Sequence, residues 1–109
     1  MAYDRALAER IRAMLAEHEP TERQMFGGFS FLVRGNLACG VMGSDMIVRI
    51  AQEDAARALR EEPFVRPFDF TGRPMRNWLY VAADGIEADE DLRGWVERGV
   101  AHALTLPPK

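Results

Sequence analysis

Residues 23–50 read RQMFGGFSFLVRGNLACGVMGSDMIVRI, and this stretch decides the fold. Over 29–34, Phe29, Phe31 and Val33 alternate with Ser30, Leu32 and Arg34. Over 37–42, Leu37, Cys39 and Val41 alternate in the same way with Ala38, Gly40 and Met42. A period of two is typical of β-strands, because successive side chains of a strand point to opposite faces of the sheet. The two segments are therefore expected to be neighbouring strands.

Two groups of turn residues bound these segments. Residues 34–37 read RGNL and residues 43–45 read GSD. Gly, Asn, Asp and Ser accept a positive φ or bond to their own backbone, so both groups indicate tight hairpin turns. With 23–26 as the first strand and 46–50 as the last, the stretch predicts a meander of about four strands.

Helical patterns and one more strand flank the meander. Apolar residues at three- and four-residue steps predict a helix over 3–18 and another over 89–103, and an alanine-rich helix is expected over 51–60. Closely spaced prolines make 64–75 the least regular stretch, and alternation returns in a strand over 78–82.

The order of these elements predicts an α+β fold of the type α-β-β-β-β-α-β-β-α. Hairpin-length connections imply a mainly antiparallel sheet of about five or six strands, with helices packed on one face. No repeat, linker or low-complexity run interrupts the pattern, so we expect a single domain over residues 1–109.

Composition limits the classes of function. Seventeen acidic and fourteen basic residues give a net charge of −3, so the chain as a whole lacks the positive field that drives non-specific binding to nucleic acids or anionic membranes. Cys39 cannot form an internal disulfide, and His18 and His102 offer no tetrahedral metal set. The sequence has no apolar run long enough to predict an export signal or a membrane-spanning helix. We expect a cytoplasmic protein without a cofactor.

Several strings in the chain resemble a known family. RQMFGGFSF at 23–31, followed by GNLACGV at 35–41, resembles the N-terminal domain of TfoX/Sxy, the bacterial regulators of natural competence. The resemblance continues through four further segments, namely MIVRI at 46–50, FDFTGRPMRNW at 68–78, WVERG at 95–99 and LPPK at 106–109.

This resemblance implies a compact α+β domain similar to the type III secretion chaperone arrangement, which often dimerises. It also implies a link to the transcription of competence genes, in which full-length family members act with a second, helical domain and with the cyclic-AMP receptor protein. It implies no catalytic residues. The shared motif residues, which we interpret as structural, are Met25, Phe26, Gly27, Gly28, Gly35, Asn36, Cys39, Gly40, Gly72, Pro74 and Met75.

Two parts of this motif set have a functional alternative. The segment 25–28 (MFGG) would suit a recognition loop, but a turn or bulge with Met25 and Phe26 in the core explains it better. Cys39 is expected to point inward together with Leu37 and Val41, which favours a core thiol over a nucleophile.

Titratable residues near helix ends are expected to serve the helices. His18 and His102 lie at the ends of the first and last predicted helices, where we interpret them as caps rather than as acid–base catalysts. Asp89, Glu90 and Asp91 lack the ligand spacing of a calcium loop, so we interpret them as helix-capping residues.

Cations and aromatic residues interleave in one stretch. Arg66, Arg73 and Arg76 are interleaved there with Phe68, Phe70 and Trp78. This composition is typical of a single-stranded nucleic-acid surface or of a protein-binding hot spot. The alternative is that the aromatic side chains pack inward while the arginines pair with Glu61, Glu62 and Asp69. The candidate partner-binding residues are Arg66, Arg73, Arg76 and Trp78.

The leading hypothesis is a non-enzymatic cytoplasmic module that binds another protein, as a homodimer, in a transcription-linked role. One alternative is a direct nucleic-acid binder that uses the arginine- and aromatic-rich stretch. Another is an enzyme or small-ligand carrier with a pocket between sheet and helices, although the sequence offers no paired carboxylates, Ser-His or Cys-His pair, or metal-ligand spacing for such a role.

Overall fold

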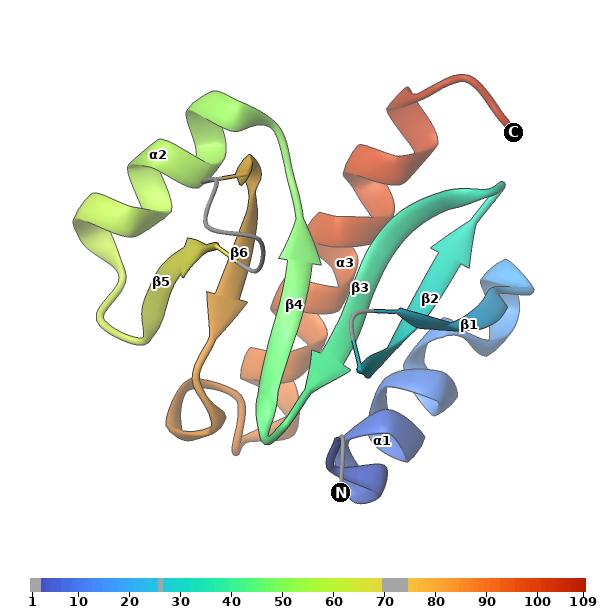
Figure 1. Ribbon diagram of the computed structural model, residues 1–109, viewed down its shortest axis with the longest axis horizontal. Helices are drawn as coiled ribbons and strands as arrows, with labels where there is room; N and C mark the ends of the chain where they lie inside the picture. Colours follow the sequence, from blue (N-terminus) through green and yellow to red (C-terminus); the bar gives the residue numbers. More distant parts are fainter. Residues whose placement is uncertain (1–2, 26, 70–74) are drawn as a thin grey trace.

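The predicted meander forms the larger part of a six-stranded antiparallel sheet in the computed structural model, which describes residues 3–25, 27–69 and 75–109 (Figure 1). The strand order is β1-β2-β3-β4-β6-β5, and every neighbouring pair is antiparallel. The strands are β1 (Thr21–Met25), β2 (Gly28–Val33), β3 (Asn36–Met42), β4 (Asp45–Arg49), β5 (Val65–Phe68) and β6 (Met75–Val81). The predicted α+β fold and element order are confirmed.

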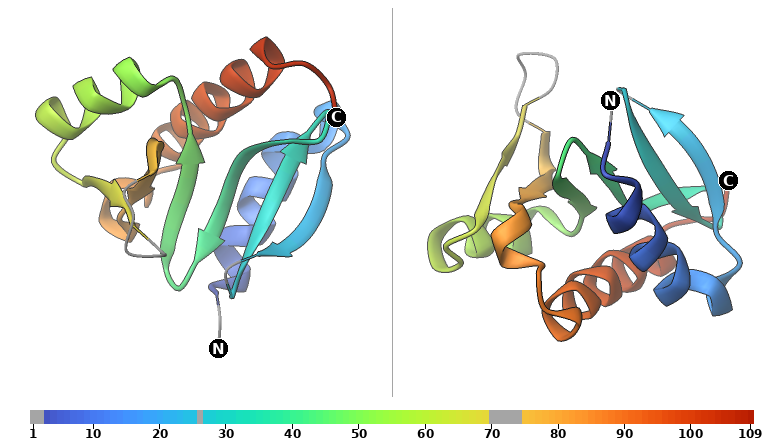
Figure 2. Two further views of the ribbon diagram at one scale, coloured as in Figure 1. Left: turned by 45° about the horizontal axis from the view of Figure 1, so that its top comes forward. Right: turned by 90° about the horizontal axis from the view of Figure 1, so that it is seen from below.

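The helices lie together on one face of this sheet, and the opposite face carries none of them (Figure 2). The chain forms α1 (Arg5–Leu15), α2 (Gln52–Glu61) and α3 (Asp89–Thr105), with short 3₁₀ turns η1 (Ala16–His18) and η2 (Ala83–Gly85). Buried residues from all three α-helices join those of the sheet in the main core. We call the uncovered side the helix-free face.

The first helix begins later than its apolar pattern predicts. Asp4 is the N-cap of α1, and its carboxylate accepts hydrogen bonds from the backbone N–H groups of Ala6 and Leu7 at 2.9 and 3.2 Å. Tyr3 therefore lies outside the helix, where it forms a bridge to Gly43 and stacks on Phe29 with ring centroids 5.3 Å apart. The pattern was misleading because an aromatic residue before a cap can pack on the sheet instead.

A bulge in β3 corrects the predicted orientation of one residue. Phe31 pairs with Cys39, whereas the next residue of β2, Leu32, pairs with Leu37, so Ala38 is an extra residue in β3. Cys39 and Val41 face the main core as predicted, but Leu37 packs with the apolar cluster of the helix-free face. Strict alternation is wrong here, because a bulge shifts the pleat by one position.

The same bulge is where α3 comes closest to the sheet. A Cβ atom added to Gly99 would lie 2.2 Å from the carbonyl oxygen of Ala38 and 3.2 Å from a methyl group of Val48. No side chain fits between the helix and this backbone, so only glycine permits the approach.

Gly99→Ala should therefore lower the free energy of unfolding by about 2 kcal/mol, because α3 must move away from β3 to admit the methyl group. Gly94→Ala is the matched control in the same helix, since an added Cβ there has no neighbour within 4 Å. That control should raise stability by up to ~1 kcal/mol through helix propensity alone. Urea unfolding checks both, and equal stability of the two variants would contradict the tight contact.

The β2–β3 turn also holds the C-terminal segment. Arg34 and Gly35 both have positive φ, at 55° and 83°, as a two-residue hairpin turn requires. Asn36 is 2% exposed, and its side-chain amide donates a hydrogen bond to the carbonyl of Pro107 at 3.0 Å. The N–H of Lys109 donates to the carbonyl of Arg34 at 2.9 Å. Asn36, the first residue of β3, thus holds the C-terminal segment against the turn.

Asn36→Ala should release this segment and lower the free energy of unfolding by about 1 kcal/mol, the typical net value of one hydrogen bond. The measurement is urea unfolding together with the rate at which carboxypeptidase shortens the chain. Ser44→Ala, in the exposed β3–β4 turn, is the control and should change neither the free energy of unfolding nor the rate of digestion. Unchanged digestion of the Asn36 variant would show that the amide does not hold the tail.

Candidate interaction surface

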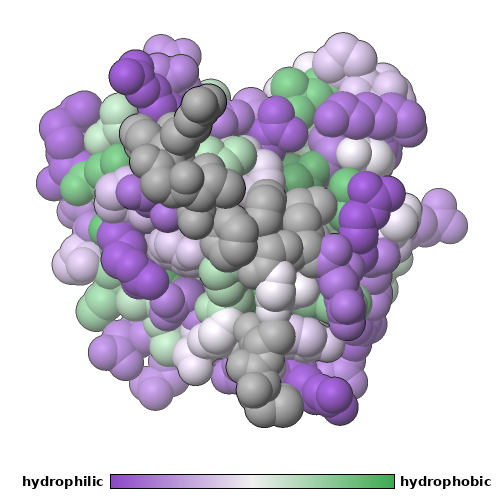
Figure 3. Space-filling model, viewed as in Figure 1, coloured by the Kyte–Doolittle hydropathy of each residue, from purple (hydrophilic) through white to green (hydrophobic). Residues whose placement is uncertain are grey.

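The helix-free face carries an apolar cluster of its own. Leu37, Ile47 and Phe68 are buried there. Four partly buried side chains pack against them, namely Met42, Met75, Trp78 and Tyr80. In the space-filling view of this face, apolar (green) and near-neutral (white) side chains border the atoms drawn in grey, and hydrophilic (purple) ones lie at the flanks (Figure 3). Part of the sheet surface is thus apolar without a covering helix.

Phe68, Trp78 and Tyr80 form the aromatic part of this surface, which we call the aromatic cluster. Phe68 is fully buried, and its ring centroid lies 5.2 Å from that of Trp78 and 4.9 Å from that of Tyr80. Both rings are tilted at about 40° to Phe68, an arrangement favoured by aromatic quadrupoles. Trp78 and Tyr80 are half-buried and so reach the surface in fixed positions.

Arg66 is held flat on this cluster. Its guanidinium carbon lies 4.6 Å from the centroid of the Tyr80 ring, and its Nη2 donates to Oδ2 of Asp45 at 2.6 Å. The expectation that Arg66 pairs with a nearby acid in the sequence is wrong, because its partner comes from β4, 21 residues away. Neither Asp45 nor Tyr80 was singled out from the sequence, since their approach depends on β6 lying between β4 and β5.

Tyr80 is a neutral anchor in this arrangement. Its hydroxyl donates to Sδ of Met42 at 3.2 Å. Burial is the main cause that raises the pKa of the Tyr80 phenol; Arg66 opposes this shift, while Asp45 and Asp69 add to it. The ring therefore presents a protonated hydroxyl at neutral pH.

The structure brings part of the predicted partner-binding set together. Arg66 and Trp78 both border the aromatic cluster, and exposed Arg76 precedes Trp78 by two positions on β6. Arg49 lies directly opposite Trp78 in the β4–β6 register. The remaining predicted residue, Arg73, lies outside the described residues, as do Phe70, Gly72 and Pro74 of the same stretch.

The motif glycines near the β1–β2 turn have structural explanations. Gly27 has a φ of 78°, and Met25 pairs with Gly28 across a two-residue turn. Added Cβ atoms would lie 2.2 Å from the Val41 carbonyl oxygen at Gly28 and 2.5 Å from a β2 carbonyl oxygen at Gly40. The two positions admit no side chain. Phe26 and the side chain of Met25 lie outside the described part, so their predicted place in the core is not addressed.

The titratable residues near the helix ends lie where the sequence predicts them. His18 lies in η1 directly after α1, and His102 lies in the last turn of α3. Burial lowers the pKa of His102 and the positive charge of Arg49 lowers it further, while Asp54 opposes the shift. The N-cap of α3 is Ala88; Asp89, Glu90 and Asp91 form its first turn, where their negative charge suits the helix N-terminus, although no side chain of the described residues caps it. Within residues 3–25, 27–69 and 75–109, no group of His, Cys, Asp and Glu is arranged to hold a metal ion.

Cys39 is completely buried, and burial raises the pKa of its thiol to about 12. Folding favours the protonated thiol, so this contribution to stability is present below the ordinary thiol pKa and is lost as pH rises towards 12. Iodoacetamide at pH 8 should therefore label the folded chain about a thousandfold more slowly than the chain in urea. Mass spectrometry measures both rates, and rapid labelling of the folded chain would contradict the core placement.

A family model identifies the family to which the chain belongs. The family model described as the TfoX N-terminal domain matches residues 13–103. Because the match covers most of the chain, the protein belongs to this family. The search of curated proteins gave no match. None of the helices in the described parts of the chain has the length and apolarity needed to cross a bilayer.

Proposed function

We propose that this member of the TfoX N-terminal domain family is a non-enzymatic cytoplasmic module that binds another protein through its helix-free face, as a homodimer and in a transcription-linked role. Family membership supports a domain of the competence- and transcription-regulator type. The observation that carries the choice of surface is the aromatic cluster, with Arg66 stacked on Tyr80 beside Trp78.

This surface has the properties of a protein-binding hot spot. Trp, Tyr and Arg dominate such hot spots because they combine large contact areas with hydrogen-bonding groups. Here the side chains are already fixed by Phe68 and Asp45, so little conformational entropy would be lost on binding. Preorganised anchors of this kind favour binding over a purely structural role.

The same surface is less suited to bind nucleic acid than to bind a protein. Stacking of bases on Trp78 and Tyr80 would be possible, but Asp45 neutralises Arg66 and the chain carries a net charge of −3. A phosphate-binding surface needs uncompensated cations. Among the described residues beside Trp78, Arg49 and Arg76 do not offset this net negative charge.

Arg76→Glu and Trp78→Ala should each abolish capture of the partner by the tagged chain from its native lysate. Arg76 is exposed, so its replacement tests the surface without disturbing the core. Arg60→Glu, an exposed charge reversal on α2, is the control and should capture the partner normally. The measurement is nuclease-treated affinity capture, mass spectrometry of the eluate and light scattering for the oligomeric state.

Recovery of a transcription factor or polymerase subunit, lost in both surface variants, would support the proposal. Recovery of the chain alone would refute it. Capture of the partner by both variants at the normal level would also refute it. Fluorescence anisotropy with labelled single- and double-stranded oligonucleotides tests the other occupant. Binding that weakens steeply with salt and disappears in Arg76→Glu would assign the surface to nucleic acid instead.

A further inference from the structure

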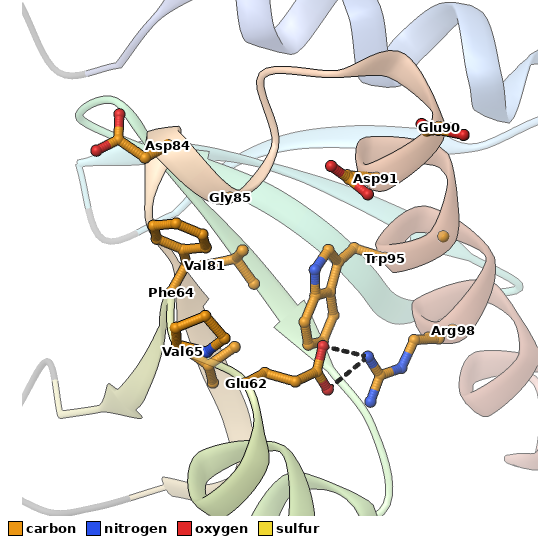
Figure 4. Close-up of a pocket in the computed structure, with 12 residues that line it drawn as sticks. Glu62, Phe64, Val65, Val81, Asp84, Gly85, Glu90, Asp91, Trp95 and Arg98 are labelled. Atoms are coloured by element: carbon orange, nitrogen blue, oxygen red, sulfur yellow. Dashed lines mark hydrogen bonds and ion pairs between the residues drawn. The ribbon is translucent and has the colours of Figure 1, made fainter.

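We propose that a groove on the helix side of the sheet receives an arginine side chain from a basic segment of a partner protein. The groove lies between the start of β5, η2 and the first half of α3, and encloses about 380 Å³ (Figure 4). It is separate from the helix-free face, so this inference goes beyond the proposed function and can stand or fall without it.

Two aromatic side chains form the walls of the groove. Phe64 is 45% exposed, an unusual position for a large apolar side chain, whereas Trp95 is 7% exposed and anchored in the core. Their rings lie on opposite sides of the opening, with Val81 behind them (Figure 4). A flat cation entering between them would meet aromatic surface on either side.

The charges around the groove are strongly unbalanced. Four carboxylates line it, from Glu62, Asp84, Glu90 and Asp91, against the single guanidinium of Arg98. Arg98 is already engaged, because its Nη1 lies 3.1 Å from Oε2 of Glu62. Among the described residues the other three carboxylates form no ion pair. The groove is therefore complementary to a positive charge and repels phosphate.

Arg98 also shows the mode of recognition that the groove offers. Its guanidinium carbon lies 4.0 Å from the centroid of the Trp95 ring while Glu62 accepts its hydrogen bonds. A guanidinium stacks on a ring and bonds a carboxylate within one plane, which an ammonium cannot do equally well. A second arginine, with its stem along Phe64 and its head near Asp91, would repeat this arrangement.

Helix α3 leaves room at one position for the arginine side chain of a partner. Gly94 is in the interior of α3 and lines the groove, and an added Cβ there would have no neighbour within 4 Å. Glycine weakens a helix interior, and unlike Gly99 this one is not required by packing. A larger residue would extend into the groove. Gly85 has the opposite role, because its bare Cα lets Phe64 pack directly against the η2 turn.

The test uses the full chain and the peptide acetyl-Ala-Arg-Ala-Arg-Ala-amide. Its matched control carries citrulline, the neutral isostere, in place of arginine. The indole N–H signals of Trp95 and Trp78 are followed by ¹H–¹⁵N spectroscopy. We expect a saturable shift of the Trp95 signal with the arginine peptide only, weakening at high ionic strength while the Trp78 signal stays in place.

Two variants locate the binding. Glu90→Gln/Asp91→Gln removes two exposed charges and should weaken peptide binding about fivefold. Glu17→Gln/Glu19→Gln removes two equally exposed charges at η1 and should leave it unchanged. Gly94→Leu should abolish the shift by filling the groove.

Equal responses to the arginine and citrulline peptides, or none to either, would overturn the proposal. So would a response at Trp78, or unchanged affinity in Glu90→Gln/Asp91→Gln. If the Trp95 signal shifts when the chain alone is concentrated, a second copy of the chain occupies the groove. This result would also overturn the proposal. None of these outcomes depends on capture through Arg76 and Trp78, so the two proposals fail independently.

Discussion

The contact between Gly99 and the carbonyl of Ala38 is the constraint on which the rest of the structure depends. It requires a glycine within the helix α3 and an extra residue in the strand β3, and each of these irregularities is explained by the other. With the helix fixed at this depth, Trp95, one turn earlier on the same face, is anchored in the core while it lines the groove. The geometry of the groove is thus a consequence of core packing.

A second fastening fixes the beginning of the same helix. Nη2 of Arg10, on α1, donates to the carbonyls of Ile86 and Glu87 and to the carboxylate of Asp89, each at 3.0 Å. One guanidinium therefore ties α1 to the segment that enters α3. Asp89 therefore has a structural role. The other two acidic residues of the first turn, Glu90 and Asp91, line the groove.

The sequence predicts the local parts of this structure and fails where distant segments meet. Alternation and turn residues predict the sheet, because both depend on neighbours in the chain. The bulge at Ala38 is not visible in the pattern, and it lies where α3 packs against the sheet through Gly99. The partner of Arg66 was missed because Asp45 reaches it only through the strand order, and the lowered pKa of His102 because its burial depends on packing. The turn between β2 and β3 was predicted at the right place, but Asn36 begins β3 and its bond to Pro107 depends on a segment 71 residues away.

One arrangement recurs at the places where the described elements join, namely an arginine stacked on an aromatic ring and oriented by a carboxylate. Arg12 lies over Phe31 at 5.8 Å and binds Glu22, Arg66 lies over Tyr80 and binds Asp45, and Arg98 lies over Trp95 and binds Glu62. In each case the carboxylate holds the guanidinium over the ring, so the pair forms a nearly neutral surface. The surroundings then decide what each pair can do. The first joins α1 to β1, the second adds to the apolar cluster of the helix-free face, and the third stands beside three carboxylates that form no ion pair within the described residues. The same local chemistry therefore favours an apolar protein surface on the helix-free face and a cationic side chain at the groove.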